Sequence, residues 1–165
     1  MIQELLVHQL RDTLHAEKQL LKALPKMAKA ANSVQLQQLF ENHLVETEAQ
    51  VDRLNQCFNL LRTNAKAKPC KGMAGLVEEG QEVMEEGKEK EEVAADLALI
   101  GSAQKVEHYE ISSYMTMKNL AQQLRVPAIV QLLNLSLAEE QNSDQLLTQL
   151  AQPLMSAARM PASVE

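Results

Sequence analysis

The sequence predicts an all-α protein, a four-helix bundle made of two helical hairpins joined by a long crossover that contains a short helix. Three observations predict this class. The 165 residues are 45% hydrophobic but include only five Gly, five Pro and no Trp, whereas β-sandwiches and barrels need aromatic residues and frequent turns. Apolar residues recur every three to four positions over four long stretches. One connection between these stretches is far longer than a tight turn.

The first hairpin is expected to combine a helix over residues 2–31 with a second helix that reaches Leu61. Asn32 and Ser33 supply the turn between the two helices and an N-cap for the second one. Pro25 lies inside the first helix, where proline removes a backbone donor and clashes with the preceding turn. We therefore expect either a kink at this proline or an early end of the helix followed by a restart.

A long crossover follows the first hairpin. Residues 63–72 have the composition of a loop, and residues 73–86 resemble a short helix between two glycines. The whole stretch from 63 to 90 is long enough to span the length of the bundle. Two hairpins joined in this way form the ferritin-like arrangement, in contrast to a simple up-down-up-down bundle.

The second hairpin is expected to pair a helix over residues 91–124 with a helix over residues 127–151. Apolar residues again recur at helical spacing along both stretches. The C-terminal tail over residues 153–165 is expected to fray. The sequence therefore predicts a single ferritin-like helical bundle domain over residues 1–152.

Charge and cysteine content exclude several classes of function. The net charge of −6 provides no basic face, so nucleic-acid binding is disfavoured and cations are the expected partners. The N-terminus lacks the features of a signal peptide, and no segment approaches about 18 uninterrupted apolar residues, so we expect no membrane span. Cys57 and Cys70 fit neither a CxxC pair nor a disulfide framework, which indicates a cytoplasmic location.

Each long helix carries at least one acid on the stripe that faces the predicted core. These acids are Glu17 in the first long helix, Glu46 in the second, Glu107 and Glu110 in the third, and Glu140 in the fourth. Burying one ionised carboxylate without a partner is costly, and burying several together adds repulsion. The core stripes offer no matching number of Arg or Lys, so divalent metal is the simplest counter-charge. Bundle proteins hold two iron or manganese ions with carboxylates from four helices.

A further ligand is expected from the second long helix. His43 lies one turn from Glu46 and shares its face with Gln50, so either side chain fits that role. A single Glu on an apolar stripe is more often a boundary residue, but an acid at mid-length of all four helices favours a metal site. His108 directly follows Glu107 and therefore points about 100° away from it, which predicts a surface position.

Five stretches that span almost the whole chain resemble the YciE/YciF stress-protein family of ferritin-like proteins. They are DTLHAEKQLLKALPKMAKAA (12–31), ENHLVETEAQVDRL (41–54), KPCKGMAGLVEEG (68–80), AQKVEHYEISSY (103–114) and LAEEQNSDQLL (137–147). The resemblance implies a ferritin-like fold, a homodimer and a bacterial cytoplasmic setting associated with stress. It brings no firmly assigned activity.

The second hairpin is similar to the wider di-iron pattern, because Glu107 and Glu140 lie 33 residues apart. The first hairpin departs from that pattern. Glu17 and Glu46 lie 29 residues apart, and Ala49 stands where the pattern has a histidine. On the fourth long helix the corresponding histidine position holds a serine. The site would therefore be rich in oxygen and poor in histidine, which favours hard or borderline cations.

Two classes of function follow from these features. The first is a di-metal carboxylate protein that binds two divalent ions, with iron the leading metal and manganese the second choice, and acts on iron, peroxide or oxygen as a ferroxidase- or peroxidase-like enzyme. The alternative is a non-catalytic stress protein that dimerises through its helical surface. The shortage of histidines favours the alternative, and convergence of the acids favours the first.

Overall fold

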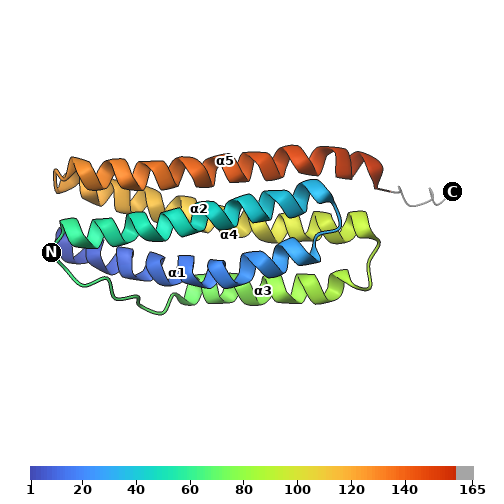
Figure 1. The fold of residues 1–165 in the computed structure, drawn as a ribbon, viewed down its shortest axis with the longest axis horizontal. Helices are drawn as coiled ribbons and strands as arrows, with labels where there is room; N and C mark the ends of the chain where they lie inside the picture. Colours follow the sequence, from blue (N-terminus) through green and yellow to red (C-terminus); the bar gives the residue numbers. More distant parts are fainter. Residues whose placement is uncertain (159–165) are drawn as a thin grey trace.

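Five helices make up the fold in the computed structural model, which describes residues 1–158 (Figure 1). They are α1 (Ile2–Ala30), α2 (Val34–Leu60), α3 (Lys71–Gly87), α4 (Glu92–Gln123) and α5 (Pro127–Ala157). The described residues contain no β-strand, so the all-α prediction is confirmed. Within the same residues, none of the helices combines the length and the apolar character that crossing a membrane requires.

The four long helices lie side by side as two hairpins, α1 with α2 and α4 with α5 (Figure 1). Helix α1 also packs against α4, and α2 packs against α5. The crossover leaves the end of α2, runs along the outside of the bundle and continues into α3, which packs against α1 and α4. The predicted long crossover with a short helix is therefore present, and it returns the chain to the opposite end of the bundle, so that α4 runs in the same direction as α2.

A buried acid fixes the turn between α1 and α2 against the start of α4. Ser33 caps α2 by accepting a hydrogen bond from the backbone N–H of Leu36 at 3.3 Å, as its sequence position predicts. The side chain of Asp96 is buried and accepts 2.8 Å hydrogen bonds from the backbone N–H groups of Asn32 and Ser33. It also accepts a 3.2 Å bond from the Asn32 amide. These bonds hold the first hairpin in register with the second.

Two prolines lie inside helices. Pro25 lies inside an unbroken α1, so the predicted early end and restart do not occur. Helix α5 continues through Pro153 to Ala157, so the part of the expected tail up to residue 157 is helical. Both prolines are exposed, so the carbonyl that each one leaves without a backbone donor is able to face water. The expectation of fraying for residues 159–165 lies outside the described part of the chain.

The core consists of two apolar clusters separated by a polar layer at mid-length. On α1, for example, Leu10 belongs to one cluster and Leu24 to the other. On α2, Phe40 and Phe58 are divided between the clusters in the same way. On α2 the buried polar residues His43, Thr47 and Gln50 fall between the members of the two clusters, and Glu107 and Glu110 do so on α4. Apolar side chains therefore enclose the polar layer on both of its sides along the length of the bundle.

Candidate metal centre

The polar layer draws side chains from all four long helices. Its buried members are Glu17 from α1, His43, Thr47 and Gln50 from α2, Glu107 and Glu110 from α4, and Ser136, Glu140 and Ser143 from α5. On each helix these residues continue the alternating three- and four-residue spacing of the neighbouring leucines. That spacing keeps a side chain on the core-facing seam of a bundle helix. The polar residues are therefore inside because of their register.

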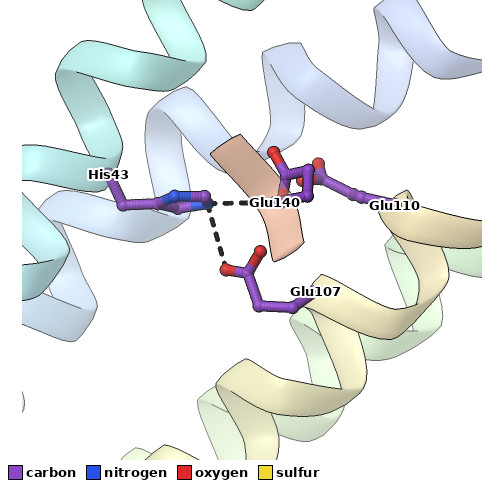
Figure 2. A group of neighbouring side chains, drawn as sticks. All are labelled: His43, Glu107, Glu110 and Glu140. Atoms are coloured by element: carbon purple, nitrogen blue, oxygen red, sulfur yellow. Dashed lines mark ion pairs between the residues drawn. The ribbon is translucent and has the colours of Figure 1, made fainter. Parts of the chain in front are cut away.

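Four of these residues come together as one group: His43, Glu107, Glu110 and Glu140. Each offers a nitrogen or oxygen atom that lies within 4.8 Å of those of the other three. Figure 2 shows the imidazole of His43 pointing across the bundle toward the carboxylates from α4 and α5. Its Nε2 lies 3.2 Å from Glu107 Oε1 and 4.0 Å from Glu140 Oε2. None of the four residues is more than 3% exposed.

Glu17 is buried beside this group. One of its oxygens, Oε1, accepts a 2.9 Å hydrogen bond from the hydroxyl of Tyr114, which is itself fully buried. Its other oxygen, Oε2, has no hydrogen-bond partner among the described residues. Burial, with a further contribution from the nearby charge of Glu140, raises the pKa of Glu17 to about 8. The ionisation of Glu17, the acid predicted on the first helix, is therefore linked to the charges of the group of four.

Glu46 lies at the edge of the layer and not in the group of four. Its side chain is 30% exposed. One oxygen lies 3.4 Å from His43 Nδ1 and accepts a 3.2 Å hydrogen bond from the Ser143 hydroxyl. The buried seam of α2 continues from His43 to Thr47. The step of four residues from His43 to Thr47 leaves Glu46 on the flank of α2. The heptad spacing of the sequence already indicated that Thr47 and not Glu46 faces the core.

Gln50 is fully buried, whereas two charged residues next to it satisfy each other. The Gln50 amide nitrogen donates to Glu139 at 3.4 Å, and its carbonyl oxygen has no partner among the described residues. Arg53 pairs with Glu139 and donates a 3.2 Å hydrogen bond to Ser136. Arg53 was not among the predicted site residues, although it lies one turn from Gln50 on the same helix. The positive charge of Arg53 is therefore paired with Glu139 and does not neutralise the glutamates of the group of four.

Most oxygens of the buried glutamates have no donor. Within residues 1–158, no Lys or Arg nitrogen lies within 4 Å of these carboxylates. The layer's buried atoms without a hydrogen-bond partner are Glu17 Oε2, His43 Nε2, Gln50 Oε1, Glu107 Oε2 and both side-chain oxygens of Glu110 and Glu140. Buried polar atoms are normally paired. Converging acceptors without donors have the chemistry of a cation site, so these residues fit a metal.

The protonation of the layer follows from its burial and from the repulsion between its acids. Burial and the charge of Glu140 raise the pKa values of Glu107 and Glu110 well above the ordinary range. Burial acts to raise the pKa of Glu140 as well, but the neighbouring carboxyls of Glu107 and Glu110 and the charge of His43 lower it. Burial opposes a charge on His43, yet Glu46 and Glu140 raise its pKa. Without a metal, the raised pKa values favour the protonated forms of Glu17, Glu107 and Glu110, and the lowered pKa of Glu140 favours its ionised form.

His108 lies outside the layer, as its position beside Glu107 predicts. Its side chain is 68% exposed, and its Nε2 lies 3.1 Å from a carboxylate oxygen of Asp144. The surface position expected for this residue is confirmed.

The chain matches a known protein family along almost its whole length. Residues 1–159 match the family described as a domain of unknown function, DUF892. The chain belongs to the DUF892 family. The protein YciF of Escherichia coli strain K12 is 47% identical to it over 152 residues, which cover 91% of this chain and 90% of YciF. The resemblance to the YciE/YciF stress proteins is therefore confirmed.

Solved structures of related proteins share the helical arrangement. The crystal structure of the E. coli stress protein YciF superimposes with a TM-score of 0.91 at 41% identity, covering 96% of this chain and 99% of that one. YcfI from Rhodopseudomonas palustris superimposes with a TM-score of 0.84 at 37% identity, covering 90% of this chain and 93% of that one. The two apolar clusters and the layer between them thus lie within a fold that these DUF892-like structures share.

Proposed function

We propose that this protein is a di-metal carboxylate protein of ferritin-like architecture that handles iron and peroxide during stress. One observation carries the proposal: glutamates from three helices converge in the core, and most of their oxygens have no donor. An ionised carboxylate in such a place needs a counter-charge. The nearby Arg53 is paired elsewhere, so the protein itself supplies only His43.

The number of acids supports two ions. Glu17, Glu107, Glu110 and Glu140 are each at most 3% exposed. When ionised they carry four negative charges, which two divalent cations balance. Glu140 is the natural shared ligand, because it interacts both with Glu17 and with the carboxyls of α4. The proposed ligands are these four glutamates with His43, and Glu46 is left out because it lies at the edge.

The donor set favours a hard or borderline cation. It contains four carboxylates and one imidazole, and no thiolate, since Cys57 and Cys70 lie in the two apolar clusters. Carboxylate-rich sites suit iron and manganese more than zinc or copper. We propose iron as the resident metal and manganese as the second choice.

The surrounding residues have separate tasks in this proposal. A bound pair of ions supplies the electron-transfer capacity for oxidising Fe(II) with oxygen or for reducing peroxide. The Tyr114 hydroxyl holds Glu17 in place through its 2.9 Å bond. Glu107, Glu110 and Glu17 release their protons when a cation arrives, because their raised pKa values keep them protonated without one. The apolar clusters on both sides exclude water from the layer.

Metal content tests the proposal. The protein is purified without chelator, reconstituted anaerobically with Fe(II) and measured by elemental analysis, with an expected two ions per chain. Glu140→Gln and Glu107→Gln should each lower the content by at least one ion. Glu79→Gln is the matched control, because Glu79 is an exposed acid that pairs with Lys105 on the surface. An unchanged iron content in Glu140→Gln contradicts the proposal.

A non-catalytic structural role is the second candidate, and the protonation of the layer favours it. The raised pKa of Glu17, about 8, allows this acid to be neutral at physiological pH without a metal. Fully loaded protein that turns over neither Fe(II) nor peroxide would support this role. Turnover that disappears in Glu140→Gln would exclude it.

We further propose a homodimer that works in the bacterial cytoplasm without contact with nucleic acid or membrane. Two buried free thiols support the reducing compartment, because oxidising compartments favour disulfides. The net charge of −6 opposes binding to phosphate backbones. Sedimentation equilibrium tests the dimer, and a mass equal to one chain at micromolar concentration contradicts it.

A further inference from the structure

A pocket of about 450 Å³ lies between α2 and α5 and extends from the start of α2 to the edge of the polar layer. Its deepest lining residues are His43 and Ser143, which are 2% and 4% exposed. Glu46 also lines it and is 30% exposed. The pocket therefore connects the outside of the bundle with side chains that belong to the layer.

Short steps connect the pocket with the buried glutamates. One Glu46 oxygen lies 3.4 Å from His43 Nδ1. On the other side of the imidazole ring, His43 Nε2 lies 3.2 Å from Glu107 Oε1. The ring therefore stands between a carboxylate in the pocket and the group of four. Rotation of this single side chain would connect the two carboxylates.

The lining of the pocket suits a cation. It contains amide, hydroxyl and apolar side chains, with Glu46 as the acid and no Lys or Arg. The pocket of about 650 Å³ bordered by α1, α3 and the start of α4 differs in this respect, because Lys26, Lys29 and Lys88 line it and no residue of the layer does. A carboxylate in a cleft without Lys or Arg attracts cations and speeds their association.

We propose that the α2–α5 pocket is the access route by which divalent cations reach the buried site, and that Glu46 receives the ion before His43 passes it inward. This inference rests on the proposed function. It assigns to Glu46 a role in the rate of loading, in place of a role as a ligand in the loaded site.

The test measures the rate of metal loading separately from the amount bound. Metal-free protein is mixed with Co(II), and the rise in visible absorption is followed by stopped flow. Glu46→Gln should slow association about tenfold at low salt while the final absorption stays the same. Its matched control is Glu48→Gln, an exposed acid two residues away on α2 that does not line the pocket.

A second pair of variants narrows a pocket without changing charge. Leu146 lines the α2–α5 pocket and is 42% exposed, so Leu146→Trp fills space there with little effect on the core. It should slow both association and chelator-induced release by a similar factor. Gln81→Trp is its control, because Gln81 lines the lysine-rich pocket away from the layer.

The outcomes separate the two proposals. If Glu46→Gln and Leu146→Trp load Co(II) at the wild-type rate while Glu140→Gln fails to bind it, the access route is wrong and the metal site stands. If Glu46→Gln binds less metal at equilibrium, Glu46 is a ligand and the access role is rejected. If wild-type protein binds no Co(II), iron or manganese, the proposed function itself fails.

Discussion

Helix α4 carries two kinds of buried acid, and the contrast between them explains why only one kind indicates a metal. Asp96 is 2% exposed and Glu110 is 1% exposed. Asp96 accepts three hydrogen bonds from Asn32 and Ser33 at the α1–α2 turn. Both oxygens of Glu110 have no hydrogen-bond partner among the described residues. Burial alone is therefore not a sign of a ligand site, whereas burial without donors is.

The two environments differ in what supplies the donors. Asp96 faces a helix start, where backbone N–H groups are free because no preceding turn accepts from them. Glu110 faces the middle of other helices, where every backbone N–H is already used within its own helix. An acid at mid-bundle must therefore take a proton, accept from a side-chain donor or bind a cation.

The largest expected effect concerns pH in the metal-free protein. The pKa of Glu17 is about 8 in the folded state and 4.5 ordinarily, so its contribution to stability is present below 4.5 and is lost as pH rises through 8. The raised pKa of His43 acts in the same direction. At about 1.4 kcal/mol per pKa unit, ionisation of Glu17 should lower the free energy of unfolding by about 3 kcal/mol between pH 5.5 and 8.5. Glu17→Gln should not show this decrease.

Urea unfolding of wild type and Glu17→Gln in the presence of chelator measures this effect. The difference between the two free energies of unfolding should move in favour of Glu17→Gln as pH rises. An identical pH dependence in both proteins would mean that Glu17 is not buried as an acid.

Asp96→Asn should have the next largest effect. The amide keeps one acceptor oxygen and turns an NH₂ group toward backbone donors, so the unfolding free energy should fall by about 2 kcal/mol. Iron content should stay at the wild-type value, because Asp96 lies at the α1–α2 turn and not in the polar layer. A loss of iron in this variant would break the distinction between the two kinds of acid.

Tyr114→Phe should have a smaller effect, since it removes one hydrogen bond and keeps the aromatic packing. Glu17 Oε1 then loses its donor at 2.9 Å, which should lower the stability of the metal-free protein by about 1 kcal/mol. Adding manganese should reduce this difference if the ion takes over the orientation of Glu17. A thermal unfolding series with and without manganese measures both values.

Glu110→Gln should have the smallest effect on the metal-free protein. Burial raises the pKa of Glu110 well above the ordinary range and so favours its uncharged form. At acidic pH the uncharged amide of Gln is therefore a close substitute, and stability should change by less than about 1 kcal/mol. Metal content should nevertheless fall. Asp96→Asn and Glu110→Gln are the same chemical change, from acid to amide, on one helix. The first should lose stability and keep its metal, and the second should keep its stability and lose metal.

The sequence predicted much of this architecture because its signals are local. Periodic apolar residues located the long helices to within a few positions, except that α5 continues past the predicted end at residue 151 to Ala157. Ser33 was identified as a cap from its place before an apolar run. Glu17, Glu107, Glu110 and Glu140 were predicted to be buried from interrupted apolar lines, and all four are.

Contacts between helices limited what could be predicted. Asp96 was missed because its donors are more than 60 residues away in the chain. The pairing of Arg53 with Glu139 likewise depends on how α2 and α5 face each other. Glu46 and Thr47 are adjacent, and a rotation of one residue about the α2 axis decides which of them is buried. The step of four residues from His43 to Thr47 in the heptad spacing already favoured burial of Thr47.

Helix α3 contributes none of the buried residues of the polar layer, although it covers α1 and α4 along much of their length. Exposed positions on α3 are therefore free to change among relatives without altering the chemistry of the centre. Gly72 is an exception, because a Cβ there would lie 2.6 Å from the Tyr109 hydroxyl. Substitutions on α3 can therefore form a new binding surface without changing the polar layer, provided that the first turn of α3 keeps its close contact with α4.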